Sequence, residues 1–474
     1  MIIHREVEQR MMTRFFLLIL AALSFVTINA QPLSQRLDVL LNEEVLKTSE
    51  VGIAVFDLTT GESLYRYQDE KLYRPASVEK IITSVTALSQ LGTGYTMDTR
   101  LCYTGKVAND TLKGSLYLVG GFDPKFTDED LNRLVEAVAN SGIHYISDTL
   151  AADVSMTDSV YWGPGWSWDD TPSSFQPYLS PLMLNGGCVD VSVSPTQKGI
   201  QPRVTCSPVS DYYKVNNQAT SHNPQAGKLK VTRNWLNNGN IITISGNSAS
   251  PYTGKLNVFA SNDFFFRTFI GRLSQKGITA RVNTYADCPP SGINMVTLQR
   301  PLKEVLEEAL KESDNLYAES MFYHLAAKHA LRKRVTSDDG TDAINAFMKA
   351  TLGFNPDHYK IVDGSGVSLY NYISPRLLLE YLKYAYYHSD LFMPFYESLP
   401  IAGVDGTLQY RMKQTKAQGN VHAKTGTVTG ISSLAGYAKA ANGHQLAFVI
   451  INQNVLKAAQ ARAFQDKVCE ILVR

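Results

Sequence analysis

The pattern of hydrophobic and polar positions predicts a mixed α/β protein. Apolar runs and alternating segments indicate strands, apolar residues three or four positions apart indicate helices, and turn residues such as Asn442-Gly443 separate them. The expected strands are 51–57, 63–68, 421–428, 432–440 and 445–453, and the expected helices are 77–90, 128–141, 261–276, 301–312, 315–331 and 456–472. Neither end of the chain supplies a complete sheet, so we expect the strands of both ends to pair.

The middle of the chain interrupts this sheet. Residues 31–95 and 295–474 are predicted to form one domain, and residues 96–294 an inserted region made of two small lobes. Two segments of the insert, 131–153 and 265–287, each read as a helix, a Gly-Ile pair, a strand and an Ala-Asp pair. This repetition suggests two related α/β lobes.

The first thirty residues have the layout of a secretory signal peptide. Three arginines precede an uncharged apolar run from Phe15 to Ile28, and Ala30 is the expected cleavage position. The apolar run is shorter than the ~20 residues that a membrane-spanning helix needs, although a membrane anchor is the alternative interpretation. We therefore expect residues 1–30 to be removed on export, which leaves no stable membrane anchor.

Composition and charge add to this prediction only by excluding some classes of function. Of 474 residues, 44% are hydrophobic and 19% charged, with a formal net charge of +1, which is typical of a folded protein. No basic run is present, so nucleic-acid binding is not expected. The five cysteines are scattered, and neither a metal nor a cofactor is predicted. In an oxidising compartment we expect Cys188 and Cys206 to form a disulfide, because both lie in one β-rich stretch.

The first motif with candidate chemistry is Ser77-Val-Glu-Lys80. It begins a predicted helix, so the hydroxyl and the amine lie on one helical face. A serine hydroxyl needs a base to become a nucleophile, and a lysine removed from water can serve because desolvation lowers its pKa. The helix N-terminus adds N–H groups that can stabilise an oxyanion. Taken alone, an ordinary helix cap beside a solvated lysine explains this motif better.

Two further motifs lie in the second half of the chain. Ser313-Asp-Asn315 separates two predicted helices; the serine could relay a proton and the asparagine could hold a carbonyl, although these residues are also common helix caps. Lys424-Thr-Gly-Thr427 lies on a predicted strand. Its lysine and threonines could bind a carboxylate, and Gly426 would let a ligand backbone approach closely. The alternative is a solvated strand edge.

Together, the three motifs form the signature of penicillin-binding proteins and class A β-lactamases. The long separation of Ser77 and Ser313 argues against a class A β-lactamase. The chain resembles instead the D-Ala-D-Ala carboxypeptidase/endopeptidase family, the class C low-molecular-mass penicillin-binding proteins (peptidase family S13, penicillin-binding protein 4-like). Further segments that resemble this family are 74–80 (RPASVEK), 120–124 (GGFDP), 162–170 (WGPGWSWDD), 363–366 (DGSG), 403–407 (GVDGT) and 434–436 (LAG).

The resemblance implies a penicillin-binding-protein/β-lactamase-like transpeptidase domain, an antiparallel sheet flanked by helices, with a large α/β insert. It also implies a periplasmic, serine-type D-Ala-D-Ala carboxypeptidase and D,D-endopeptidase that acts on peptidoglycan stem peptides. Ser77 would be the nucleophile, Lys80 its base, and Ser313 the relay to the leaving group. The N–H groups of Ser77 and Thr427 would form the oxyanion hole. The residues expected to bind substrate are Asn315, Lys424, Thr425, Gly426, Thr427, Asp170 and Phe175.

One departure from the family bears on the substrate. Where the family carries an arginine that binds a free carboxylate of meso-diaminopimelate, this chain has Leu369. Leucine cannot pair with a carboxylate. We therefore expect the site to accept an amidated or different diamino acid, or to recruit another arginine.

β-Lactams are expected to inhibit by acylating Ser77, because they mimic the D-Ala-D-Ala terminus. Two other functions stay open. A β-lactamase or esterase on the same fold would release the acyl group rapidly, and a non-catalytic cell-wall binding protein would not react at all. The sequence does not indicate an oligomeric state.

Overall fold

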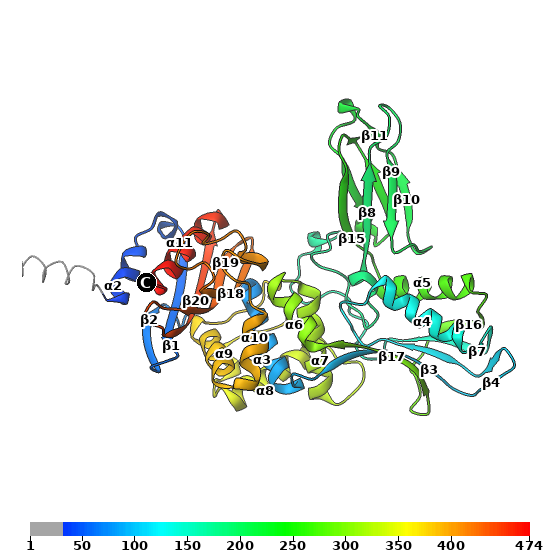
Figure 1. The fold of residues 1–474 in the computed structure, drawn as a ribbon, viewed down its shortest axis with the longest axis horizontal. Helices are drawn as coiled ribbons and strands as arrows, with labels where there is room; N and C mark the ends of the chain where they lie inside the picture. Colours follow the sequence, from blue (N-terminus) through cyan, green and yellow to red (C-terminus); the bar gives the residue numbers. More distant parts are fainter. Residues whose placement is uncertain (1–31) are drawn as a thin grey trace, which may run out of the picture.

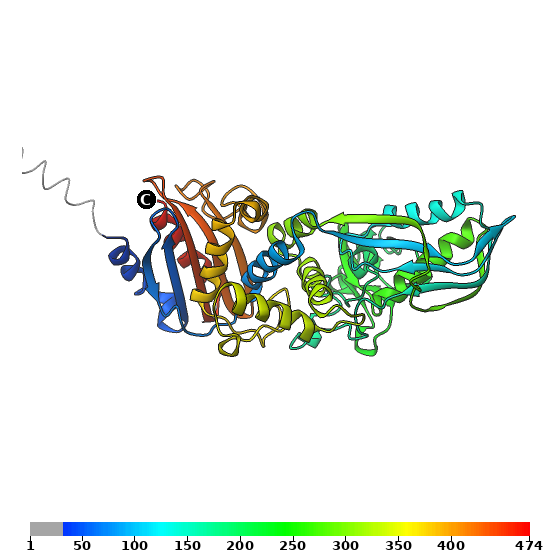
Figure 2. The same ribbon diagram turned by 90° about the horizontal axis from the view of Figure 1, so that it is seen from below.

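The computed structural model describes residues 32–474, and the predicted signal peptide lies outside the described residues. A domain built from both chain ends lies at one end of the longest axis and an α/β lobe at the other (Figure 2). A β-rich lobe projects sideways from the α/β lobe (Figure 1). Within residues 32–474, the helices are all too short or too polar to cross a membrane.

The domain built from both ends holds a five-stranded antiparallel sheet in the order β18-β19-β20-β1-β2. Ile53 of β1 lies opposite Ile450 of β20, so the two ends of the chain meet inside the sheet, as predicted. β18 forms one edge of the sheet. The strands are β1 (Glu50–Asp57), β2 (Glu62–Tyr67), β18 (Val421–Val428), β19 (Gly430–Lys439) and β20 (Gln445–Val455).

Helices cover both faces of this sheet. Because side chains alternate along a strand, Ile53 and Val55 face the core beneath α2 (Leu33–Leu40) and α11 (Ala458–Leu472), whereas Ala54 faces the larger core on the other side. The helices of that larger core are α3 (Glu79–Leu91), α6 (Leu302–Lys311), α7 (Asn315–Ala330), α8 (Ser337–Thr351), α9 (Pro375–Tyr387) and α10 (Ser389–Glu397). The fold class is therefore the predicted α/β class, with an antiparallel sheet between helices.

The α/β lobe contains a seven-stranded sheet: β3 (Thr96–Tyr103), β4 (Lys106–Ala108), β5 (Thr111–Lys113), β6 (Leu116–Val119), β7 (Tyr145–Asp153), β16 (Thr279–Tyr285) and β17 (Ile293–Pro301). Helices α4 (Asp128–Asn140) and α5 (Ser261–Gln275) pack together beside it. The two repeated segments end in β7 and β16, which are adjacent parallel strands. The interpretation that each repeated segment forms a lobe of its own is therefore wrong. One helix and one strand cannot bury both faces, so the two copies complete one shared core.

The β-rich lobe is built from short strands: β8 (Cys188–Ser194), β9 (Arg203–Ser207), β10 (Lys214–Asn217), β11 (Thr220–Ser221), β12 (Lys230–Arg233), β13 (Ile241–Ser245), β14 (Asn247–Ser248) and β15 (Tyr252–Asn257). The disulfide predicted between Cys188 and Cys206 is wrong, because the strand register keeps the two cysteines apart. Cys206 lies opposite Val191, three residues along β8 from Cys188. At ~3.3 Å per residue, this offset separates the two side chains beyond the reach of a disulfide.

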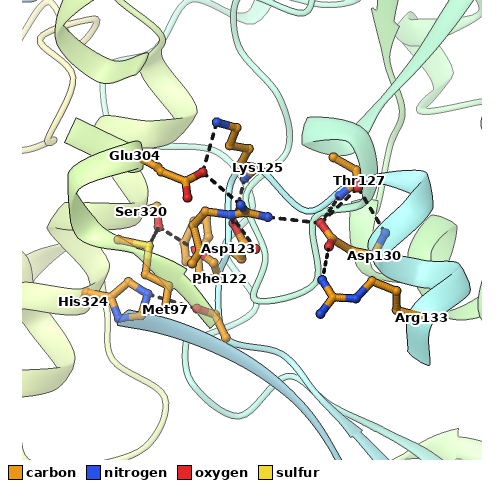
Figure 3. A network of polar contacts seen from close by, with 12 residues as sticks. Met97, Phe122, Asp123, Lys125, Thr127, Asp130, Arg133, Glu304, Ser320 and His324 are labelled. Atoms are coloured by element: carbon orange, nitrogen blue, oxygen red, sulfur yellow. Dashed lines mark hydrogen bonds and ion pairs between the residues drawn. The ribbon is translucent and has the colours of Figure 1, made fainter. Parts of the chain in front are cut away.

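A polar network joins the α/β lobe to helices α6 and α7 (Figure 3). Arg300, near the end of β17, contacts Asp123 at 3.3 Å and Asp130 at 3.1 Å. Burial raises the pKa of Asp123 to about 6, although Arg300 opposes the shift. Ser320 of α7 donates to the Phe122 carbonyl at 2.6 Å. Segment 120–124 therefore anchors the insert to the helix that begins at Asn315.

Candidate active site

Ser77 lies in a 3-10 turn, Ala76–Val78, directly before α3, where its hydroxyl meets Lys80. Lys80 Nζ lies 3.0 Å from Ser77 Oγ, 2.7 Å from Asn315 Oδ1 and 2.8 Å from the Ser365 carbonyl oxygen. The lysine is fully buried. Burial lowers the pKa of its amine to about 8, although neighbouring carboxylates oppose the shift. A neutral amine that can accept a proton from the serine is thus accessible at moderate pH.

The turn that carries Ser77 is enclosed by closely approaching backbone. A Cβ on Gly426 of β18 would lie 2.9 Å from the Pro75 carbonyl oxygen and 3.0 Å from the Ser77 nitrogen. A Cβ on Gly366 would lie 2.0 Å from the Ala76 carbonyl oxygen. The sequence argument assigned the space at Gly426 to a ligand backbone. In the structure this space lets β18 pack against the turn beside the Ser77 N–H group.

Ser313 and Lys424 form a second contact beside the first. Lys424 Nζ donates to Ser313 Oγ at 2.7 Å and to the Thr425 carbonyl at 2.8 Å. Lys424 is fully buried, and burial together with the charge of Lys80 holds the pKa of its amine well below the usual value. Ser313 has a φ of +62°, which non-glycine residues rarely adopt. Such backbone strain persists where the surrounding structure enforces it, and it clusters at functional sites.

Asn315 connects these motifs to the tryptophan-rich loop. Its Nδ2 donates to the Phe175 carbonyl at 2.8 Å and lies 3.3 Å from Gln176 Oε1, while its Oδ1 faces Lys80. The side chain of Phe175 is 47% exposed. Asp170 ends a short helix in the same loop, and burial and the nearby Asp169 raise its pKa. Among the described residues, hydrogen bonds link Phe175 to the site, whereas those of Asp170 stay within its own loop.

The remaining residues of the third motif lie at the sheet edge. Thr425 Oγ1 donates to Thr407 Oγ1 at 2.8 Å, which links this motif to segment 403–407. Thr427 is exposed on β18. Because β18 is an edge strand, part of its backbone hydrogen-bonding capacity is free for an extended ligand.

Arg74 lies beside Leu369, the position where the family carries an arginine, but its guanidinium donates to groups of the protein itself. Leu369 is 39% exposed, and its carbonyl accepts a hydrogen bond from Arg74 Nε at 2.9 Å. Arg74 Nη2 also donates to the Tyr372 hydroxyl at 3.0 Å, and its guanidinium lies over the Tyr372 ring. Sequence position 369 therefore lacks the cation, but Arg74 places a guanidinium against the same segment.

Near Lys80 lies a group of three buried carboxyl groups, those of Glu319, Glu79 and Asp363, to which the sequence analysis assigned no role. Glu319 is almost fully buried and accepts a hydrogen bond from the Gly364 amide at 3.1 Å. Burial and the charge of Asp363 raise the pKa of Glu319 to about 8. Glu79 is fully buried, and its carboxylate oxygens have no hydrogen-bond partner among the described residues. Burial raises its pKa well above the usual value.

Asp363 is the well-paired member of this group. It accepts hydrogen bonds from Trp166 Nε1 at 2.9 Å, the Gly366 amide at 2.9 Å and Asn371 Nδ2 at 2.6 Å. It therefore holds the 363–366 loop, whose Ser365 carbonyl binds Lys80. One signal for Glu319 was present in the sequence: it follows Asn315 by four positions, which places both on one face of α7. Within residues 32–474, no group of three or more His, Cys, Asp or Glu side chains could hold a metal ion.

Comparison with known proteins identifies the family. Residues 33–474 match the D-Ala-D-Ala carboxypeptidase 3 (S13) family. This chain belongs to the S13 family. It is 29% identical over 440 residues to a D-alanyl-D-alanine carboxypeptidase of Actinomadura sp. (strain R39), which covers 89% of this chain and 80% of that relative. It is 27% identical over 438 residues to D-alanyl-D-alanine carboxypeptidase DacB of Haemophilus influenzae, which covers 90% of this chain and 88% of the relative.

Solved structures show the same fold. Penicillin-binding protein 4 (dacB) from Haemophilus influenzae superposes with a TM-score of 0.80 at 24% sequence identity, covering 91% of this chain and 98% of that one. The Bd0816 predatory endopeptidase from Bdellovibrio bacteriovorus superposes with a TM-score of 0.51 at 16% identity, covering 89% and 94%. These matches confirm the fold expected from the resemblance.

Proposed function

We propose that this S13-family protein is a serine D,D-peptidase that removes the terminal D-alanine from peptidoglycan stem peptides through an acyl-enzyme. The observation that carries the proposal is the position of Lys80 Nζ between Ser77 Oγ and Asn315 Oδ1, at 3.0 and 2.7 Å. A buried amine with a lowered pKa beside a helix-terminal serine is the arrangement that nucleophilic catalysis without histidine requires.

In the proposed acylation step, neutral Lys80 accepts the proton from Ser77 Oγ while the oxygen attacks the carbonyl carbon of the penultimate D-alanine. The N–H groups of Ser77 and Thr427 would stabilise the resulting oxyanion. The close packing of Gly426 against the Ser77 amide supports this assignment, because it brings β18 beside the turn. Collapse of the tetrahedral intermediate breaks the C–N bond, and Ser313 passes the proton held by Lys80 to the departing amine. Water then attacks the acyl-enzyme, which releases the shortened peptide as a carboxylic acid and returns a proton to Ser77 Oγ.

Substrate binding would depend on the cationic side of the site. Lys424, with Thr425 and Thr427, would bind the terminal carboxylate of the substrate. Burial lowers the pKa values of Lys80 and Lys424 because it destabilises their charged forms. The charge of an anionic ligand would offset this cost, so the site favours an anion. Asn315 would orient the scissile amide, and Asp170 and Phe175 would line the pocket for the diamino-acid side chain.

The test is intact mass spectrometry of the mature protein after incubation with a penicillin. We expect a persistent adduct of one drug molecule on the wild type and none on Ser77→Ala. Ser84→Ala is the matched control, because Ser84 is a buried serine on the same helix whose hydroxyl has no hydrogen-bond partner among the described residues. Rapid drug hydrolysis without an adduct would instead indicate a β-lactamase, and unchanged drug would indicate a non-catalytic binding protein.

We further propose that the same site hydrolyses D,D-cross-links and works in the periplasm. Both reactions cleave the amide bond on the carboxyl side of a D-alanine, and only the departing amine differs. The chemistry at Ser77 is therefore unchanged. Its test is digestion of purified cross-linked muropeptide dimers, followed by chromatography. If the dimers persist while D-alanine is released from monomeric pentapeptides, the endopeptidase proposal fails and the carboxypeptidase proposal stands.

A further inference from the structure

Two cysteines far apart in the sequence meet in the α/β lobe. Cys102 lies on β3, the strand that leads into the insert, and is 2% exposed. Cys288 lies between β16 and β17, just before the strand that leads back out, and is half-buried. β3 and β17 pair directly, with Asn294 opposite Cys102. A turn closed by the Gly292 amide and the Pro289 carbonyl, at 2.9 Å, folds Cys288 back toward β3.

The space beside Gly292 brings the two side chains together. A Cβ on Gly292 would lie 2.7 Å from Cys288 Sγ and 3.5 Å from Cys102 Cβ, so both cysteines border the same small volume. Burial, together with the charge of the Cys102 thiol and a hydrogen bond to it, raises the pKa of the Cys288 thiol to about 11. The two cysteines are thus neighbours beside Gly292, and a side chain at position 292 would meet the sulfur of Cys288.

We propose that Cys102 and Cys288 form a disulfide in the exported protein. The bond would join the first strand of the insert to the segment that precedes its last strand, and so would close the whole inserted region into one covalent loop. Cross-links that close long loops restrict the unfolded chain most. This inference does not depend on the proposed peptidase function.

The chemistry requires an oxidant of the disulfide class, such as oxidised glutathione or a disulfide oxidoreductase. One cysteine thiolate attacks a sulfur of that disulfide, and the leaving thiolate takes up the proton. The second cysteine then attacks the mixed disulfide and releases the other thiol. The two cysteines lose two electrons and two protons, and the oxidant gains both. Both cysteines border an open cavity of about 860 Å³, which gives the oxidant access.

The high pKa of Cys288 has a kinetic consequence. Only the thiolate attacks a disulfide, so a raised pKa slows uncatalysed exchange near neutral pH. We therefore expect spontaneous oxidation of the reduced protein by oxidised glutathione to accelerate about tenfold per pH unit between pH 7 and 9. A rate without pH dependence would contradict direct attack by these buried thiols.

The decisive experiment maps the cross-link in the mature protein. Wild-type protein is incubated with oxidised glutathione at pH 9, denatured, and alkylated with N-ethylmaleimide. Oxidised wild type should take up two fewer alkyl groups than the reduced protein, which has five thiols, and its non-reducing digest should contain one peptide joining Cys102 to Cys288. Uptake of five groups, or a cross-link between Cys188 and Cys206, would overturn the proposal.

Variants separate the cross-link from general effects on folding. Cys102→Ser and Cys288→Ser should each abolish the linked peptide, whereas Cys206→Ser, the matched control in the neighbouring lobe, should retain it. Reduction should lower the melting temperature of the wild type by about 5–10 °C and leave that of Cys102→Ser unchanged. An equal decrease in the melting temperatures of both proteins would show that the disulfide does not stabilise the insert.

Discussion

Glu319 offers the sharpest test of how the catalytic domain is stabilised. Its carboxyl group has an ordinary pKa of 4.5 and a pKa of about 8 in the folded protein, because it is buried beside Asp363. Between these values the folded protein holds a proton that the unfolded chain has lost. The stability is therefore greatest below pH 4.5 and falls as the pH rises toward 8. At pH 7 the loss is roughly 3 kcal/mol, from about 1.4 kcal/mol per pH unit above 4.5.

Glu319→Gln removes this loss while its carbonyl still accepts the hydrogen bond from the Gly364 amide. We expect the substitution to raise the free energy of unfolding by roughly 1 kcal/mol at pH 5 and roughly 4 kcal/mol at pH 8. Urea unfolding followed by circular dichroism at both pH values measures the difference. Glu62→Gln, an exposed acid on β2, is the control and should show little change. A gain independent of pH, or destabilisation at both values, would refute the assigned pKa.

Three further predictions concern the reaction. The rate constant for acylation by penicillin should rise about fifty-fold between pH 6 and 8, because Lys80, with a pKa of about 8, must be neutral; a flat profile in stopped-flow measurements would exclude it as the base. Gly426→Ala should slow acylation about a hundred-fold with unchanged circular dichroism, because its Cβ would displace the turn at Ser77; an unchanged rate would mean that β18 does not position the nucleophile. Peptides with free and amidated diaminopimelate should have kcat/KM values within about tenfold of each other, because Leu369 offers no charge, whereas Leu369→Arg should favour the free acid; a strong wild-type preference for the free acid would contradict this.

Local patterns in the sequence were sufficient to predict helices and strands and to place Ser77 beside Lys80 in the candidate site. Strand 421–428 was predicted with the bounds that β18 has. Ser77 and Lys80 were placed together because residues three apart share a helical face. The Asn442-Gly443 pair predicted the turn between β19 and β20, which end and begin on either side of it. These successes share one cause: each depends on neighbours within a few positions of the chain.

The failures depend on contacts between distant segments. Cys188 and Cys206 were paired because both lie in one β-rich stretch, but strand register separates them, whereas the turn at Gly292 places Cys288 beside Cys102. The repeated segments were assigned to two lobes, whereas β7 and β16 lie side by side in one sheet. Register and lobe assignment follow from which apolar faces bury each other, and composition alone does not specify that choice.

The sequence by itself determined the motifs, the family and the chemistry of each candidate residue, because side-chain type and helical spacing are local properties. Only the tertiary structure decided what surrounds them. Lys80 has a lowered pKa because α7 and the 363–366 loop bury it with Asn315 and Ser365. Gly426 is required because β18 packs on the turn at Ser77. Burial and close packing arise from segments hundreds of residues apart, and they lower the pKa of an otherwise ordinary lysine.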